Sequence, residues 1–283
     1  MKRPLLHALA LTLSLLTGAS HAAPDEERLG RAQGYPVGTA GNWFTQESVR
    51  VGSFTRQAEI DGLLNGGVHS LAASPAPLPL PRAPAEPAYR WHIDAFRNMS
   101  LDDYLGRQRV MGLLILKDGV VQVERYQYER GAADRFVSHS MAKSLVSLAV
   151  GMALQEGRLR SLDDRADRYA SALAGTLYGE TSLRDLLRMA SGARFDERYD
   201  GADDLARFGR AAAREGLEAA ARLVSERVAP PGERFNYASP ETVMLAAVLR
   251  AATGESLSDY LQPRLWQAMG AESSALWRTD RKG

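Results

Sequence analysis

The chain has 283 residues, which is enough to bury the core of one or two domains. Its 35 basic and 34 acidic residues leave a net charge of +1 and so exclude the strong positive field of a protein that binds nucleic acid or an anionic membrane. Because the chain has no cysteine, disulfides and thiolate metal sites are excluded as well.

The first 22 residues have the pattern of a secretory signal peptide. A basic start is followed by an apolar run over residues 5–16 and a small-residue cleavage site at residues 20–22. This run is much shorter than the roughly 20 apolar residues that cross a bilayer. We therefore expect a protein exported to a bacterial periplasm or the medium, with a mature chain that starts near Ala23 and has no stable membrane span.

Residues 23–88 are interpreted as an N-terminal extension. Residues 23–71 show weak periodicity, and six prolines follow between Pro75 and Pro87. This composition is typical of an extended polyproline-type linker, which we expect to run along the surface. The main domain is then expected to cover residues 89–283.

Two apolar segments near the start of this domain predict a β-hairpin. Residues 110–116 and 120–128 flank the turn Lys117-Asp118-Gly119. Residues 140–155 predict a helix that is apolar nearly all round and therefore buried. From about residue 158 to 283 the pattern is helical, which predicts an α/β (α+β) fold with an antiparallel sheet, flanking helices and an all-helical part.

Two helices in the helical part have recognisable ends. Ser182, with Asp185 three residues later, has the spacing of a capping box. Pro240 suits the first turn of a helix that runs to Thr253 and ends at Gly254.

The sequence lacks the motifs of several common enzyme classes. There is no G-x-S-x-G, H-E-x-x-H, G-x-x-x-x-G-K-[ST] or G-x-G-x-x-G segment. No histidine follows Ser140, and His139 adjoins it, so the two side chains do not face each other on a helix. These observations argue against lipase-type, zincin and nucleotide-binding sites and against a Ser-His-Asp triad.

The segment Ser140-Met141-Ala142-Lys143 carries the main chemical signal. A spacing of three places the hydroxyl and the amine on one helical face, and a helix start offers backbone N–H groups to a developing oxyanion. Lysine occurs only at positions 2, 117, 143 and 282, and unlike arginine it can give up a proton. We predict Ser140 as nucleophile and Lys143 as base, although a serine at a helix start is also a common cap.

A second element lies about a hundred residues further on. Residues 235–240 predict a short extended piece that enters a helix, and Tyr237 within it can reach the start of the helix at residue 140. There the phenol would share the role of base or return the proton to the leaving group. Considered alone, Tyr237 also fits a packed aromatic residue with a satisfied hydroxyl.

Three segments in this order resemble the serine β-lactamase and penicillin-binding superfamily. They are residues 138–144, 185–192 and 231–239, and they are most similar to the class C-like branch with its esterases and 6-aminohexanoate-dimer hydrolases. The resemblance runs from about Tyr89 to the last residue. It implies a β-lactamase/transpeptidase-like fold, acylation of Ser140, proton transfer by Lys143 and Tyr237, and hydrolysis of the acyl-enzyme without a metal or cofactor.

Two departures from the family pattern affect the prediction. Class C β-lactamases end the tyrosine motif in asparagine, whereas this chain has Ser239, which favours esters or linear amides over β-lactams. The family's third motif, a strand that supplies half of the oxyanion hole, would lie beyond Gly283. We therefore expect a piece of a longer protein, a hairpin with an uncovered apolar face, and an uncertain activity of the chain as given. By the same resemblance the loop at residues 195–200 is expected to contribute to the substrate pocket, with Tyr199 as a pocket residue beside Ser239. The composition of this segment fits an exposed polar loop equally well.

The leading prediction is a serine hydrolase that cleaves a small carboxylic ester, a linear amide or a short peptide through an acyl-serine intermediate. One alternative is a β-lactamase or D-alanyl-D-alanine carboxypeptidase, and another is a non-catalytic binding protein of the penicillin-receptor type. No nucleic-acid partner is expected, and the sequence leaves the oligomeric state open.

Overall fold

The computed structural model describes residues 23–280 except residues 62 and 64–66, so the predicted signal peptide lies outside the described residues. No helix within the described residues is both long enough and apolar enough to cross a bilayer. The strands are β1 (Gly67–Leu71), β2 (Trp91–Ile93), β3 (Phe96–Met99), β4 (Gly112–Lys117), β5 (Val120–Tyr126) and β6 (Ala275–Thr279). The α-helices are α1 (Glu47–Thr55), α2 (Leu101–Gln108), α3 (Ala142–Gln155), α4 (Leu183–Leu187), α5 (Asp204–Glu215), α6 (Leu217–Arg222), α7 (Ser239–Thr253) and α8 (Leu257–Leu261).

Strands β4 and β5 form the predicted antiparallel hairpin. Asp118 and Gly119 connect them, and both have positive φ, 53° and 75°, as the tight two-residue turns of hairpins require. The proline-rich linker runs beside this hairpin: Val121 donates its N–H to Pro81 at 2.8 Å, and Ala83 donates to Val121 at 2.9 Å. The linker thus covers an edge of β5, which confirms the prediction that it follows the surface.

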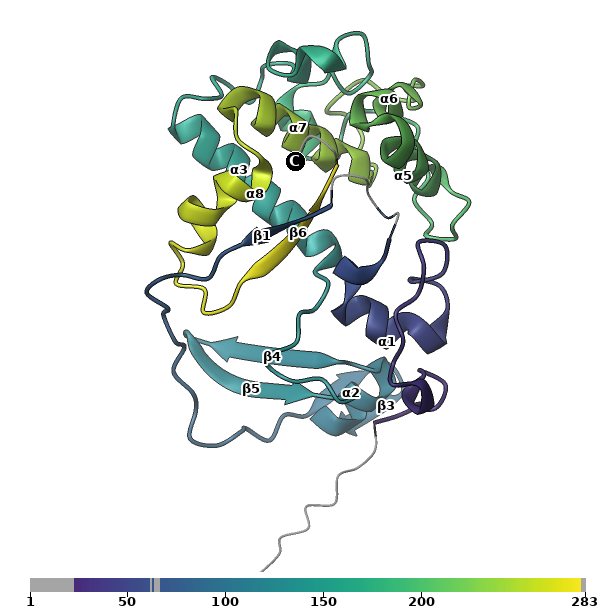
Figure 1. Cartoon of the computed structure of the whole chain (residues 1–283), viewed down its shortest axis with the longest axis vertical. Coiled ribbons are helices and arrows are strands. Elements are labelled where there is room, and N and C mark those ends of the chain that lie inside the picture. Colours follow the sequence, from purple (N-terminus) through teal and green to yellow (C-terminus); the bar gives the residue numbers. More distant parts are fainter. Residues whose placement is uncertain (1–22, 62, 64–66, 281–283) are drawn as a thin grey trace, which may run out of the picture.

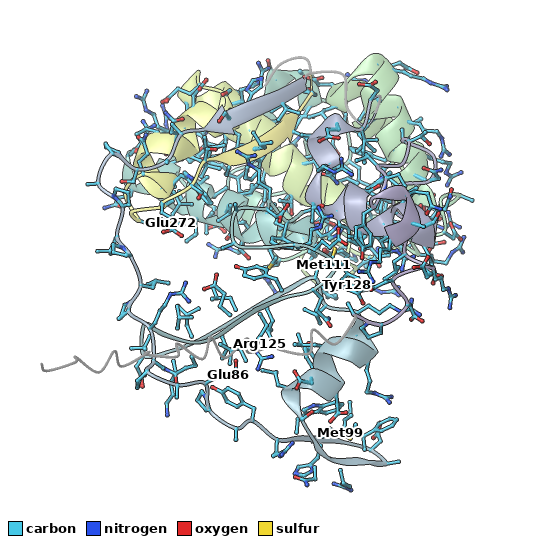
Figure 2. The ribbon with its side chains drawn as sticks, turned by 60° about the horizontal axis from the view of Figure 1, so that its bottom comes forward. Glu86, Met99, Met111, Arg125, Tyr128 and Glu272 are labelled. Carbon is cyan, nitrogen blue, oxygen red and sulfur yellow. The ribbon has the colours of Figure 1, made fainter. Side chains whose placement is uncertain are left out.

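A salt bridge adds to the attachment of the linker. Arg125 of β5 makes two hydrogen bonds of 2.7 Å to the carboxylate of Glu86 in the linker, and Figure 2 shows the two side chains next to each other. Such bidentate pairs combine charge with fixed geometry.

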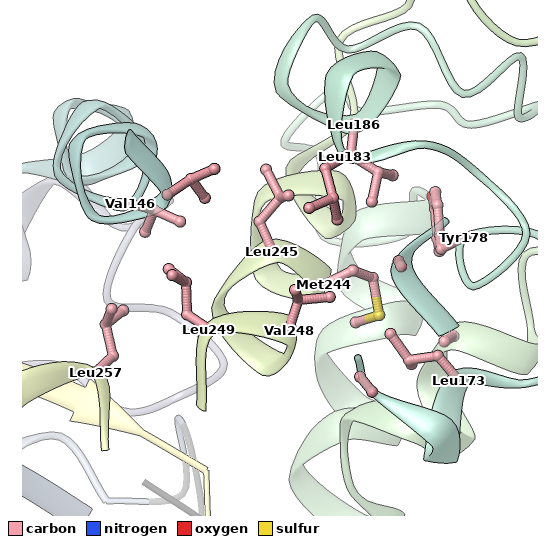
Figure 3. Close-up of a cluster of buried hydrophobic side chains, with 14 of the residues drawn as sticks. Val146, Leu173, Tyr178, Leu183, Leu186, Met244, Leu245, Val248, Leu249 and Leu257 are labelled. Carbon is pink, nitrogen blue, oxygen red and sulfur yellow. The ribbon is translucent and has the colours of Figure 1, made fainter. Parts of the chain in front are cut away.

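The main core lies in the helical part, where α3 packs on α7. Figure 3 shows Val146 of α3 close to Leu245 and Leu249 of α7, with the leucines of α4 on the other side. Helix α7 begins with Pro240 in its first turn and ends at Gly254, whose φ of 77° suits a left-handed C-cap. The predicted bounds of this helix and the N-cap role of Ser182 are therefore confirmed.

Helix α3 is buried on one face only, so the prediction that it is buried all round is wrong. Val146 is 4% exposed, but Leu148 is 53% exposed and Met141, just before the helix, is 70% exposed. The hairpin has a similar open face, with Leu114 52% exposed. Each sheet among the described residues has two strands, and the hairpin lies apart from the pair β1 and β6 (Figure 1). The expected uncovered apolar face of the hairpin is therefore present.

Strands β1 and β6 pair with each other although more than 200 residues separate them in the sequence. They are antiparallel, with Gly67 opposite Thr279, and lie over α3 and α8 (Figure 1). The prediction that residues 158–283 are all helical is wrong at β6, and the weakly periodic extension contains both β1 and α1. This pairing is non-local, so local periodicity did not reveal it.

Candidate active site

Ser140 lies in a single 3₁₀ turn, His139–Met141, which leads directly into α3. Lys143 follows in the first turn of α3, and its Nζ donates a hydrogen bond of 3.0 Å to Ser140 Oγ. The spacing of three therefore places the two groups on one face of the turn, as helical geometry requires. Ser140 is exposed and Lys143 is half-buried.

Tyr237 reaches the same hydroxyl from the segment before α7. Its OH donates a hydrogen bond of 2.7 Å to Ser140 Oγ, and the Nζ of Lys143 lies 5.0 Å from the centre of its ring. The neighbouring Asn236 fixes this segment: its backbone N–H donates to Met189 O at 2.8 Å, and its side chain donates to Phe195 O at 3.1 Å. The three side chains named from the sequence as catalytic are thus brought together.

The environment of Tyr237 lowers the pKa of its hydroxyl. Partial burial raises the pKa of its hydroxyl, but hydrogen bonds with Lys143 and Ser140 and the positive charge of Lys143 lower it by more. The pKa of Tyr237 therefore lies below the ordinary value of 10. A phenol with a lowered pKa next to a serine hydroxyl is suited to proton transfer.

Ser239 and Tyr199, the two predicted substrate-binding residues, both contact Glu197. Ser239 donates its backbone N–H and its hydroxyl to the Glu197 carboxylate, each at 2.7 Å. The Tyr199 hydroxyl donates to the same carboxylate at 2.7 Å. The sequence analysis missed Glu197; its position two residues before Tyr199 in an acidic and aromatic loop was the signal that could have identified it.

Tyr199 lies at the edge of the site with 46% of its surface exposed. Burial of its hydroxyl and the hydrogen bond with Glu197 raise the pKa of this tyrosine, and the neighbouring Tyr237 also contributes. The pKa values of the two tyrosines are therefore displaced in opposite directions, and the lowered one belongs to Tyr237, which contacts Ser140.

Asp203 holds the loop that carries Tyr199. Its Oδ2 accepts the backbone N–H groups of Arg198 and Tyr199 at 2.8 and 2.7 Å, and its Oδ1 caps α5 through the N–H of Ala206 at 2.9 Å. Asp203 is only 3% exposed. This single carboxylate fixes the turn in which Tyr199 has a φ of 62°.

A cavity of about 570 Å³ lies beside the site, between α3 and α7 and below β6. Lys143 and Ser239 are among its lining residues, while most of its other walls are apolar, such as Val146, Phe208 and Trp277. A cavity of this size and composition suits a small organic molecule.

The three segments that carry the family resemblance are in contact. Gly232 donates its N–H to Ala190 O at 2.7 Å, and Asn236 bonds Met189, which joins residues 231–239 to residues 185–192. The nucleophile segment joins them through the hydrogen bond from Tyr237 to Ser140. Segments far apart in the sequence therefore form one site.

Comparisons with known proteins identify the family of the chain. A 6-aminohexanoate-dimer hydrolase of Paenarthrobacter ureafaciens is 29% identical over 210 residues, which are 72% of this chain and 53% of that protein. The chain thus spans about half the length of this relative. A Bacillus anthracis structure provisionally described as a 6-aminohexanoate-dimer hydrolase has the same fold, with a TM-score of 0.74 and 20% identity over 92% of this chain and 66% of its own. The model of the beta-lactamase family matches residues 101–282. This match covers more than half of the chain, which therefore belongs to the beta-lactamase family.

Proposed function

We propose that the protein is a serine hydrolase that cleaves small carboxylic esters or linear amides through an acyl-enzyme on Ser140. One observation carries the proposal: Ser140 Oγ accepts hydrogen bonds from both Lys143 Nζ, at 3.0 Å, and Tyr237 OH, at 2.7 Å. A nucleophile with proton-transfer groups in hydrogen-bond reach is the geometry that covalent catalysis needs.

In the reactive form of the proposed mechanism one member of the pair Lys143 and Tyr237 is deprotonated. Ser140 Oγ attacks the carbonyl carbon while its proton passes to that member. The backbone N–H of Ser140, at the start of the helical turn, is one candidate donor to the oxyanion. Collapse of the tetrahedral intermediate expels the alcohol or amine, which takes the proton from the same pair. A water molecule then attacks the acyl-enzyme and loses a proton to the pair. Collapse of the second tetrahedral intermediate breaks the bond to Ser140 Oγ, which takes that proton back as the acid is released.

The preference for a linear substrate rests on Ser239 and on the relatives. Both hydrogen-bond donors of Ser239 point to Glu197 at 2.7 Å. Position 239 therefore lacks the asparagine carboxamide that contacts the side-chain carbonyl of a β-lactam in class C β-lactamases. The names of two relatives refer to hydrolysis of the 6-aminohexanoate dimer, which is a linear amide.

Release of nitrophenol from a short-chain nitrophenyl ester, and of amine from a linear amide, tests this function. We expect turnover by the native chain and none by Ser140→Ala. The matched control is Ser147→Ala, which removes an exposed hydroxyl from the same helix and should leave the rate unchanged. Equal rates for native protein and Ser140→Ala would contradict the proposal. Acylation of Ser140 by the ester without turnover would favour a binding protein.

We also propose that the protein is exported. The distribution of the protein between cell fractions tests this proposal.

A further inference from the structure

Three aromatic side chains of the N-terminal extension surround the residue that precedes Ser140. Trp43 stacks on the His139 ring with centroids 6.1 Å apart and an interplanar angle of 14°, and Phe54 meets that ring edge-on at 4.9 Å. Phe44 contacts the same ring at 5.9 Å. We call Trp43, Phe44 and Phe54 the aromatic clamp.

His139 has a backbone conformation that needs support. Its φ is +45°, in the left-handed region that residues with a Cβ rarely adopt. Such conformations persist where surrounding structure holds them, and they concentrate at functional sites. Because Ser140 is the next residue, the φ of His139 sets the direction in which the chain enters the nucleophile turn.

A backbone hydrogen bond joins the extension to the same segment. Val137 donates its N–H to Phe54 O at 2.8 Å, two residues before His139. The clamp therefore holds residues 137–139 in two ways, through ring contacts and through the main chain.

The segment that carries the clamp is packed closely against the preceding loop. Gly52 of α1 lies so close to the preceding loop that a Cβ there would be 2.2 Å from Tyr35 O. Gly38 of that loop donates its N–H to Ser53 Oγ at 2.9 Å. The clamp also reaches the other side of the site, where the Phe44 ring lies 6.1 Å from that of Tyr199.

We propose that the aromatic clamp is a positioning element of the active site. It holds His139 at positive φ and thereby fixes Ser140 relative to Lys143 and Tyr237. The extension is then required for the chemical step as well as for packing. This inference rests on the proposed function, but part of its test does not depend on activity.

The first test compares Trp43→Ala with Trp43→Phe. Loss of the indole should lower kcat about 10- to 100-fold with KM changed less than about twofold, because a displacement of about 1 Å at a reacting group costs about that much. Trp43→Phe keeps a stacking ring and should recover most of the rate. The control is Trp91→Ala, which breaks an aromatic pair of 6.1 Å with Tyr104 away from the site and should leave kcat unchanged. Native kcat in Trp43→Ala would overturn the proposal.

A second pair of variants remains informative if Trp43→Ala folds poorly. His139→Ala and His139→Gly both remove the imidazole ring, but only glycine adopts positive φ without steric cost. If the clamp acts by holding that conformation, His139→Gly should retain at least about threefold more kcat than His139→Ala. Equal rates, or a faster alanine variant, would overturn the proposal.

Hydrogen exchange distinguishes failure of the clamp from failure of the hydrolase assignment. Amides of residues 137–141 should exchange at least about tenfold faster in Trp43→Ala than in the native chain and in Trp91→Ala. If no variant or native protein hydrolyses esters or amides, the proposed function fails, and the exchange result alone then decides on the clamp. Unchanged exchange in Trp43→Ala would overturn it.

Discussion

Glu241 is a buried carboxyl group near the start of α7, and its replacement by glutamine should change how stability depends on pH. The residue is 1% exposed, and its Oε1 accepts a hydrogen bond of 2.6 Å from Ser191 Oγ. Its Oε2 has no hydrogen-bond partner. Burial raises the pKa of Glu241 from 4.5 to about 7, although the bonds with Ser191 and Ala190 oppose this change.

The sign of the effect follows from proton binding. Between pH 4.5 and about 7 the folded protein holds a proton on Glu241 that the unfolded chain has lost. The stability that this residue contributes is therefore fully present below pH 4.5 and is lost as the pH rises through about 7. A difference of about 2.5 pH units corresponds to about 3 kcal/mol of unfolding free energy, at 1.36 kcal/mol for each unit.

Urea denaturation of the native protein and of Glu241→Gln at pH 5, 6, 7 and 8 measures this effect. The native protein should lose stability relative to the variant by about 2.5 kcal/mol between pH 5 and pH 8, because the amide does not ionise and part of the full effect is already lost at pH 5. His139 is present in both proteins, so its contribution to the pH dependence cancels in the comparison. Burial lowers the pKa of His139, and its effect on stability therefore has the opposite sign to that of Glu241. Glu226→Gln, at an exposed residue, is the control. Parallel pH profiles for native protein and Glu241→Gln would refute the reasoning.

Three further predictions concern the site itself. Tyr237→Phe should lower kcat at least about 100-fold. Because the pKa of Tyr237 is lowered, the plot of kcat/KM against pH for the native protein should reach its plateau below pH 10. Steady-state kinetics from pH 6 to 10 check both expectations. Asn236→Ala leaves carbonyl oxygens without their donor and should cost about 1–3 kcal/mol in urea denaturation, together with part of kcat; native stability would contradict this. Glu197→Ala should lower the pKa of Tyr199 toward 10, and an ultraviolet titration without any change would contradict the role of this carboxylate.

The sequence by itself was sufficient where structure depends on neighbours along the chain. A helical turn places residues three apart on one face, so Ser140 and Lys143 could be paired without a structure, and a 3.0 Å hydrogen bond joins them. The turn at Asp118-Gly119 and the ends of α7 were predicted for the same reason. The order of the three segments was also sufficient to predict the family, and the family match over residues 101–282 confirms this prediction.

Tertiary structure alone decided the contacts between distant segments. Tyr237 lies 97 residues from Ser140, and only the packed core brings their oxygens to 2.7 Å. The position of Glu197 beside Tyr199 was a local signal, but its contact with Ser239, 42 residues away in the sequence, depends on the tertiary structure. The strand at residues 275–279 was taken as helical because its partner, residues 67–71, lies more than 200 residues earlier in the sequence. Pairing and packing over such separations depend on which surfaces meet in space, and local periodicity carries no information about that.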